Sequence, residues 1–192
     1  MLHEQLRAKT QLYHENIEKK LDLMNPTLRL DRYRALIERL FGYYNPFEDI
    51  LAQCLIGKCP ELDFESRRKL QALKQDLTFL GLNDSQIASL PRCQKLPEPA
   101  NAEEALACLY VIEGATLGGQ FLAKHFRAHL QLEANRGCAF FSGYREMTGP
   151  RWRQFLHTLN SVSPTEESLG RLTAISIQTF VSLENWCCPK VL

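Results

Sequence analysis

The sequence lacks the motifs of several large protein classes. Its 192 residues contain no C-x-x-C pair, no P-loop, no dinucleotide-binding fingerprint and no G-x-S-x-G elbow. The first twenty residues are polar, and no window approaches the roughly 18 consecutive apolar residues of a membrane span. The seven cysteines are odd in number, which disfavours a disulfide framework. These absences favour a cytoplasmic protein in a reducing compartment, with no membrane partner.

The sequence also has no excess of positive or negative charge. Lys and Arg number 23 against 22 Asp and Glu, which gives a formal net charge of +1. No global field therefore recruits nucleic acid, and an anionic ligand must be held by locally placed bases. Hydrophobic residues make up 45% of the chain, an ordinary globular value. We expect one domain over residues 1–192.

The periodicity of apolar residues predicts an all-α fold, a bundle of seven or eight helices, because no run alternates with period two. Asn25-Pro26 is expected to stop the first helix, Pro46 to kink or break the second, and Asn101 to cap the longest. The predicted helices span residues 6–24, 31–56, 67–80, 85–90, 102–132, 152–159 and 166–186.

Three glycines lie inside the longest predicted helix. Gly114, Gly118 and Gly119 each cost about 0.5 to 1 kcal/mol relative to alanine in a helix interior. Gly114 and Gly118 share one face, and Ala115 lies beside them, so this face carries almost no side-chain bulk. Two explanations stay open: a flat ligand lies against the helix, or a second helix crosses it closely.

His14 on the first predicted helix is a candidate ligand. Arg7 precedes it by nearly two helical turns, so the two side chains point the same way about 10.5 Å apart. That separation suits a ligand with a metal at its centre and carboxylates at its rim. A lone histidine is more often a surface or satisfied interior residue, and it is the combination with the glycine-containing helix that favours the ligand.

Several segments, in the same order, resemble the bacterial heme oxygenases, especially the branch associated with bacterial phytochromes. Arg7, Thr10, His14 and Glu18 resemble the proximal-helix pattern of that family, and LYVIEGATLGGQ resembles its distal-helix signature. Other segments with this resemblance are LIERLFGYYNPFEDIL, KLQALKQDLTFLGL, LPRC followed by LP, and AFFSGY followed by TGPRWRQFL.

The resemblance implies that heme b is both cofactor and substrate. It would lie between the two helices and be opened with O₂ and electrons to biliverdin, CO and Fe²⁺. His14 would be the neutral imidazole ligand of the iron, oriented by Glu18. The implied heme-binding set comprises Arg7, Thr10, His14, Glu18, Gly118, Gly119, Arg153, His157 and Phe180. Within this set, Arg7, Arg153 and His157 are expected near the propionates, although Arg153 also suits a solvated helix start and Phe180 a core position.

The sequence departs from part of the family at Ala115, where mammalian-type members carry an aspartate. That acid cannot be carried over, so we expect water held near Gly114, Tyr110 and Thr116 to deliver the proton. The expected catalytic set is therefore Gly114, Ala115, Gly118, Tyr110 and Thr116.

The resemblance also implies an external electron donor such as a ferredoxin, a flavodoxin or a reductase, because no nucleotide-binding motif is present. A biliverdin-using phytochrome is a further expected partner. Two alternatives remain open because a fold does not dictate a function: a heme-handling protein that does not turn heme over, and a scaffold that binds no heme.

Overall fold

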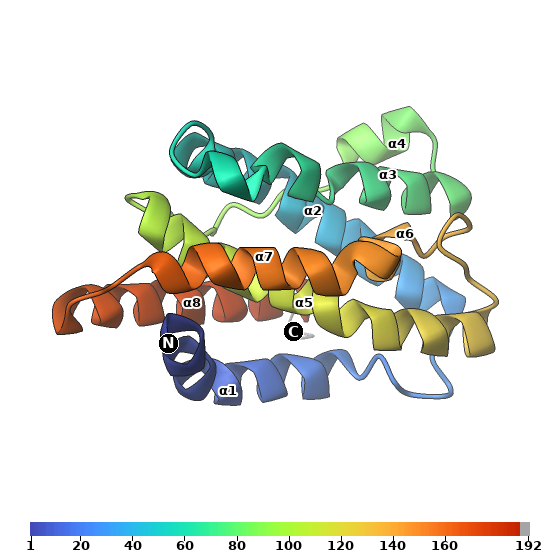
Figure 1. The fold of residues 1–192 in the computed structure, drawn as a ribbon. Coiled ribbons are helices and arrows are strands. Elements are labelled where there is room, and N and C mark those ends of the chain that lie inside the picture. Colours follow the sequence, from blue (N-terminus) through green and yellow to red (C-terminus); the bar gives the residue numbers. More distant parts are fainter. Residues whose placement is uncertain (189–192) are drawn as a thin grey trace.

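The computed structural model describes residues 1–188, which form eight α-helices and three short 3-10 helices, with no strand among them (Figure 1). The all-α prediction of seven or eight helices is thus confirmed. The α-helices are α1 (Leu2–Leu21), α2 (Leu30–Leu55), α3 (Leu70–Phe79), α4 (Asp84–Ser89), α5 (Ala102–Leu130), α6 (Ala139–Ser142), α7 (Thr148–Ser161) and α8 (Glu166–Cys187). The 3-10 helices are η1 (Pro60–Leu62), η2 (Phe64–Arg67) and η3 (Arg145–Met147).

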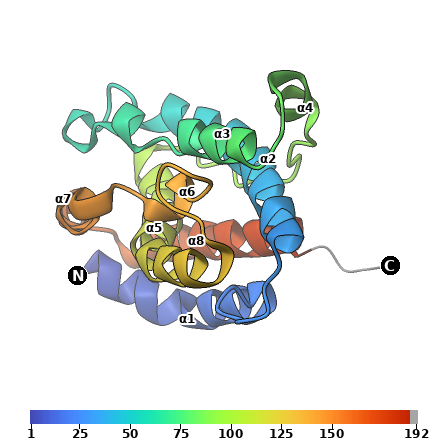
Figure 2. The ribbon, with the colours of Figure 1, turned by 90° about the vertical axis from the view of Figure 1, so that its right-hand side faces the viewer.

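Helix α5 lies at the centre of the bundle and packs against α8, α7, α6 and α2. Helix α1 runs along one side of the molecule, mainly against α8 and partly against α7 (Figures 1 and 2). The core between these helices is rich in aromatic rings. Tyr33, Tyr43, Phe47, Phe126 and Phe155 are fully buried within it.

The ends of the helices follow local backbone chemistry. The first helix ends at Leu21, before the expected stop at Asn25-Pro26, because Asp22 adopts a left-handed conformation with φ of 48°. Its N–H donates to the carbonyl of Glu18, which closes the helix. The predicted cap of α5 is confirmed, since the Asn101 side chain accepts the N–H of Glu104.

Helix α2 continues through Pro46 without ending, so the chain makes no break there. Proline has no N–H, which leaves the carbonyl of Gly42 without its helical partner. The N–H of Cys93 donates to that carbonyl instead, at 2.9 Å. The approach is close: a Cβ at residue 42 would overlap the carbonyl oxygen of Pro91 and lie 2.9 Å from the Trp186 ring. Only glycine lets the loop reach the helix.

The expectation that no stretch is long and apolar enough to span a membrane is wrong for α5. By length and composition its 29 residues pass that test, although 61% of the most apolar window is buried inside the bundle. A central helix of a soluble bundle has the same character, because it is surrounded by other helices. The apolar composition of α5 thus matches its central position.

We predict that Gly42→Ala destabilises the protein by about 1 to 3 kcal/mol or more, because the new methyl group meets a backbone oxygen that cannot move freely. Gly170→Ala is the matched control, since a Cβ there meets nothing within 4 Å. That control should gain about 0.5 to 1 kcal/mol from helix propensity. Urea unfolding measures both changes, and equal midpoints for the two variants would contradict the described packing.

Candidate functional site

One side of α5 is bare at its middle. A Cβ built at Gly114 or Gly118 meets nothing within 4 Å, and Ala115 beside them is exposed. We call the side formed by Gly114 and Gly118 the glycine face. Tyr110 and His125 lie on the same side of the helix, one before and one after these glycines.

Both ends of this side of α5 touch α1 or the loop that follows it. The rings of Tyr110 and His3 lie 5.8 Å apart between centroids, and His125 Nε2 lies 3.3 Å from the carbonyl oxygen of Asn25. Tyr110 and His125 are fifteen residues apart, about 22 Å along a helix. The glycine face therefore lies between two contacts with the α1 region.

The opposite side of α5 is tightly packed. A Cβ at Gly119 would lie 2.9 Å from the carbonyl oxygen of Phe141, so α6 crosses the helix closely there. Thr116 lies against Gly143, and its hydroxyl donates to the carbonyl of Ile112 at 3.1 Å. This placement gives Gly119 the helix-crossing role. It argues against cofactor binding by Gly119 and against water held at the glycine face by Thr116.

His14 on α1 is half exposed, with 52% of its side chain accessible. Its ring stands edge-on to that of Phe180 on α8, at 5.9 Å between centroids, and its Nε2 lies 3.6 Å from a carboxylate oxygen of Glu18. The structure thus brings together three residues of the expected heme-binding set, His14, Glu18 and Phe180. The imidazole is held by these two contacts, and about half of the side chain is exposed.

Thr10 and Tyr110 join α1 to α5. Thr10 is buried and its hydroxyl donates to the carbonyl of Leu6 at 2.8 Å. Burial raises the pKa of Tyr110, while the neighbouring Thr10 and Arg7 act in the opposite direction. Tyr110 is thus a protonated phenol beside the glycine face, able to donate a hydrogen bond at neutral pH.

His3 also lies in this region, although the sequence analysis did not single it out. Its ring contacts those of Tyr110 and Trp152, each at 5.8 Å between centroids, and its backbone N–H donates to Asn160. Burial, together with Arg7, lowers its pKa and favours the neutral imidazole. A lone histidine near the N-terminus gives no sequence signal for such a contact.

The expected propionate bases come from two helices, Arg7 from α1 and Arg153 and His157 from α7. All three side chains are exposed. Within residues 1–188 none of them forms an ion pair or a side-chain hydrogen bond. The structure therefore places them on two helices that pack together, with their side chains open to solvent.

A buried set of charges lies behind the glycine face. Glu113 directly precedes Gly114. The side chains of Glu113 and Arg67 are each 1% exposed, and the Arg67 guanidinium donates to the Glu113 carboxylate at 2.8 Å. Tyr144 donates its hydroxyl to the same carboxylate at 2.6 Å, and the ammonium of Lys69 lies 3.6 Å away. We call these four residues the Glu113 cluster. None of the four was an expected site residue, although an acid inside the apolar run LYVIEG is a signal for Glu113.

Glu48 on α2 extends this buried charge. One of its oxygens accepts the backbone N–H of Lys69, whereas its other oxygen and the Lys69 ammonium have no hydrogen-bond partner among the described residues. Burial raises the pKa of Glu48 to about 7 and lowers that of Lys69 to about 8. Neither charge is fully compensated by hydrogen bonds.

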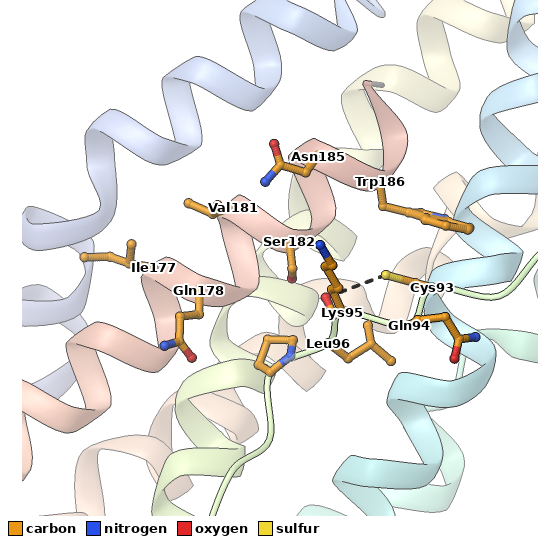
Figure 3. A pocket seen from close by; sticks show the side chains of 11 residues that line it. Cys93, Gln94, Lys95, Leu96, Ile177, Gln178, Val181, Ser182, Asn185 and Trp186 are labelled. Carbon is orange, nitrogen blue, oxygen red and sulfur yellow. Dashed lines mark hydrogen bonds between the residues drawn. The ribbon is translucent and has the colours of Figure 1, made fainter. Parts of the chain in front are cut away.

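A groove of about 620 Å³ lies on another side of α8, between that helix and the loop after α4 (Figure 3). Leu96, Pro97, Ile177 and Val181 give it an apolar lining, and among the described residues Lys95 is the one charged residue that lines it. None of the expected site residues lines it. The groove is therefore separate from the candidate site.

The family model described as heme oxygenase matches residues 1–187. The chain belongs to the heme oxygenase family. A curated relative, the heme oxygenase of Xanthomonas campestris pv. campestris (strain 8004), is 33% identical over 98 residues. That alignment covers 50% of this chain and only 54% of the relative.

Solved heme oxygenases share the fold. The enzyme from Neisseria meningitidis superposes with a TM-score of 0.79 at 22% identity, over 100% of this chain and 98% of the other. Heme oxygenase-2 from Synechocystis sp. PCC 6803, solved in complex with heme and NO, gives a TM-score of 0.81 at 21% identity, over 97% of this chain and 83% of the other. The helical arrangement is therefore that of the family.

The three glycines of α5 should respond differently to alanine. Gly114→Ala and Gly118→Ala should stabilise the ligand-free chain by about 0.5 to 1 kcal/mol, because helix propensity improves and no contact is lost. Gly119→Ala should destabilise it by about 1 to 3 kcal/mol, because the methyl group meets the Phe141 backbone. Thermal and urea unfolding decide this, and destabilisation by all three substitutions would refute the open glycine face.

We predict that Glu48→Gln alters how stability depends on pH. The pKa of Glu48 is raised in the fold, so the native state binds more protons than the unfolded chain between about pH 4.5 and 7. Wild-type stability should therefore fall, relative to Glu48→Gln, as pH rises through that window, by roughly 2 to 3 kcal/mol. Urea unfolding at several pH values measures the difference. A constant difference would contradict the burial of this carboxyl.

Proposed function

We propose that this protein is a heme oxygenase, which uses O₂ and externally supplied electrons to convert heme to biliverdin, CO and Fe²⁺. One observation carries the proposal beyond family membership. Helix α5 has no side-chain bulk at Gly114 and Gly118, and this side of it contacts α1 at one end and the loop after α1 at the other. Helix α1 carries an accessible imidazole at His14. A flat molecule with a metal at its centre fits such a pair of elements.

The metal-ligand chemistry of the chain supports heme in particular. Among residues 1–188 no group of three or more His, Cys, Asp or Glu side chains could hold a metal ion. Iron at His14 would therefore have to bring its other ligands with it, as it does in a porphyrin. The Synechocystis relative was solved with heme bound, which agrees with this choice of ligand.

In this proposal His14 binds the iron and Glu18, close to the ring, orients the imidazole. Phe180 supports the same ring from α8. The exposed cations Arg7 and Arg153, with His157, pair with the propionates. When bound, heme supplies the iron at which dioxygen is activated and the carbon skeleton that is opened.

The remaining roles belong to the glycine face. The bare backbone at Gly114 and Gly118 leaves room above the ring that a side chain would occupy. Ala115 is exposed and carries no acid, so proton supply falls to water held by backbone carbonyls and by the protonated phenol of Tyr110. Both oxygens of the Glu113 carboxylate already accept hydrogen bonds on the other side of the helix, one from Arg67 and one from Tyr144.

The electron donor follows from the chemistry, and the phytochrome from the resemblance to the branch associated with bacterial phytochromes. Ring opening consumes electrons, and the sequence has no nucleotide fingerprint, so a ferredoxin, a flavodoxin or a reductase must deliver them. The product biliverdin would serve a phytochrome that uses it as chromophore. Both partners belong to the proposal.

The experiment is a hemin titration followed by addition of a reductant in air, with wild type, His14→Ala and a control, His129→Ala, an exposed histidine of α5. Wild type and control should form a histidine-ligated complex and convert it to biliverdin. His14→Ala should lose the ligation signature and at least about 90% of turnover.

Added imidazole should restore part of the ligation signature in His14→Ala, which separates a lost ligand from a lost fold. Stable heme in wild type, after an adequate electron donor has been supplied, would contradict the enzyme and indicate a heme-handling protein. An unchanged spectrum in His14→Ala would contradict the ligand assignment.

A further inference from the structure

Four contacts hold the back of α5 against one short segment, residues 141–145. Glu113 bonds to Tyr144, Thr116 lies against Gly143, Gly119 lies against Phe141, and Gln120 donates to the carbonyl of Arg145 at 2.7 Å. The α5 residues are spaced by three, three and one, so they share the side of the helix that faces away from Gly114 and Gly118. The glycine face is thus backed by a continuous packed contact.

The segment that makes these contacts is itself held in place. Gly143 and Arg145 adopt positive φ angles of 55° and 54°, which gives the chain a sharp turn. The Tyr144 ring lies between two cations, with the Lys69 ammonium 3.5 Å and the Arg151 guanidinium 4.4 Å from its centroid. The phenol therefore has one orientation, toward Glu113.

Glu113 is equally constrained. One carboxylate oxygen accepts from Arg67 at 2.8 Å and the other from Tyr144 at 2.6 Å. Arg67 is fixed in turn, because it also donates to the carbonyl of Leu62 at 2.8 Å and to the side chain of Gln154 at 3.1 Å. The carboxylate thus points away from the glycine face and cannot replace the acid that Ala115 lacks.

We propose that Glu113 is a positioning residue: through the Glu113 cluster it sets the rotation and depth of α5, and thereby the clearance between the backbone of Gly114 and Gly118 and a heme bound on the glycine face. Since this face has no side chains, the position of the helix alone determines that clearance. The inference rests on the proposed function, because the bound molecule is the heme of that proposal.

Two tyrosine variants test this as a matched pair. Tyr144→Phe removes the hydroxyl that bonds Glu113 at 2.6 Å and keeps the ring between its two cations. Tyr43→Phe is the control, since Tyr43 is also buried and its hydroxyl bonds Ser182 at 2.7 Å, between α2 and α8. Each variant loses one tyrosine hydroxyl that makes a short hydrogen bond, and only Tyr144 belongs to the Glu113 cluster.

The first readout is amide hydrogen exchange in the hemin-free protein, which needs no heme activity. Tyr144→Phe should raise exchange across residues 112–120 by at least about tenfold, because the helix loses part of its backing. Tyr43→Phe should leave that stretch within about twofold of wild type. Glu113→Gln, a second variant, should loosen the same stretch, because Arg67 and Lys69 lose their counter-charge.

The second readout uses the hemin complex. In Tyr144→Phe the pH at which the visible spectrum of the ferric complex changes should shift by about 0.5 unit or more, and kcat should fall several-fold at nearly unchanged KM for hemin. Tyr43→Phe should match wild type in both. A purely structural role for the cluster would lower thermal stability without moving either quantity.

Unchanged exchange at residues 112–120 in both Tyr144→Phe and Glu113→Gln would overturn the inference. Faster exchange would also overturn it if neither kcat nor the pH at which the spectrum of the ferric complex changes were altered. Failure of the proposed function looks different, because wild type itself would then form no hemin complex or leave the heme intact, while the exchange data would still report whether the cluster holds the helix.

Discussion

The packed contact between the back of α5 and residues 141–145 is the constraint on which the rest of the molecule depends. It holds a helix with three interior glycines, each of which lowers its intrinsic stability. With its back secured, α5 can leave Gly114 and Gly118 without cover. One helix thereby combines a core side and a bare side, and the function proposed for the protein uses the bare side.

Burying charge beside that contact has a physical consequence. A buried ion pair often adds little net stability, whereas removing one partner leaves an uncompensated charge at high cost. Arg67, Lys69, Glu113 and the neighbouring Glu48 are best understood in this way, as groups that specify one arrangement rather than as a source of stability. The unusual backbone at Gly143 and Arg145 fits the same interpretation, because it delivers Tyr144 to Glu113.

The helices were predictable because apolar periodicity and caps are local signals. Asn101 caps α5 as predicted, and α8 covers nearly its predicted range. Pro46 shows where local rules fail, because its effect on α2 is compensated by Cys93, a residue distant in sequence. The apolar character of α5 was underestimated because its charged residues lie mostly near its two ends, with only Glu113 in the middle.

The candidate site was predictable only in part. The pairing of His14 with Glu18 follows from helical spacing, and the contact with Phe180 agrees with what the resemblance implied. The sequence did not predict that Gly114 and Gly118 are uncovered whereas Gly119 is packed against α6. Spacing alone does not determine which side of a helix such a short segment covers. The Glu113 cluster unites η2, α5 and the loop before α7, and such a set of distant residues leaves no pattern in the sequence.

A crystal structure of the hemin complex tests the central claim most directly. The account predicts that iron is bound by the imidazole of His14 and that the porphyrin lies against the backbone of Gly114 and Gly118, with residues 141–145 still packed behind α5. Heme ligated by another residue, or bound in the groove between α8 and the loop after α4, would contradict it.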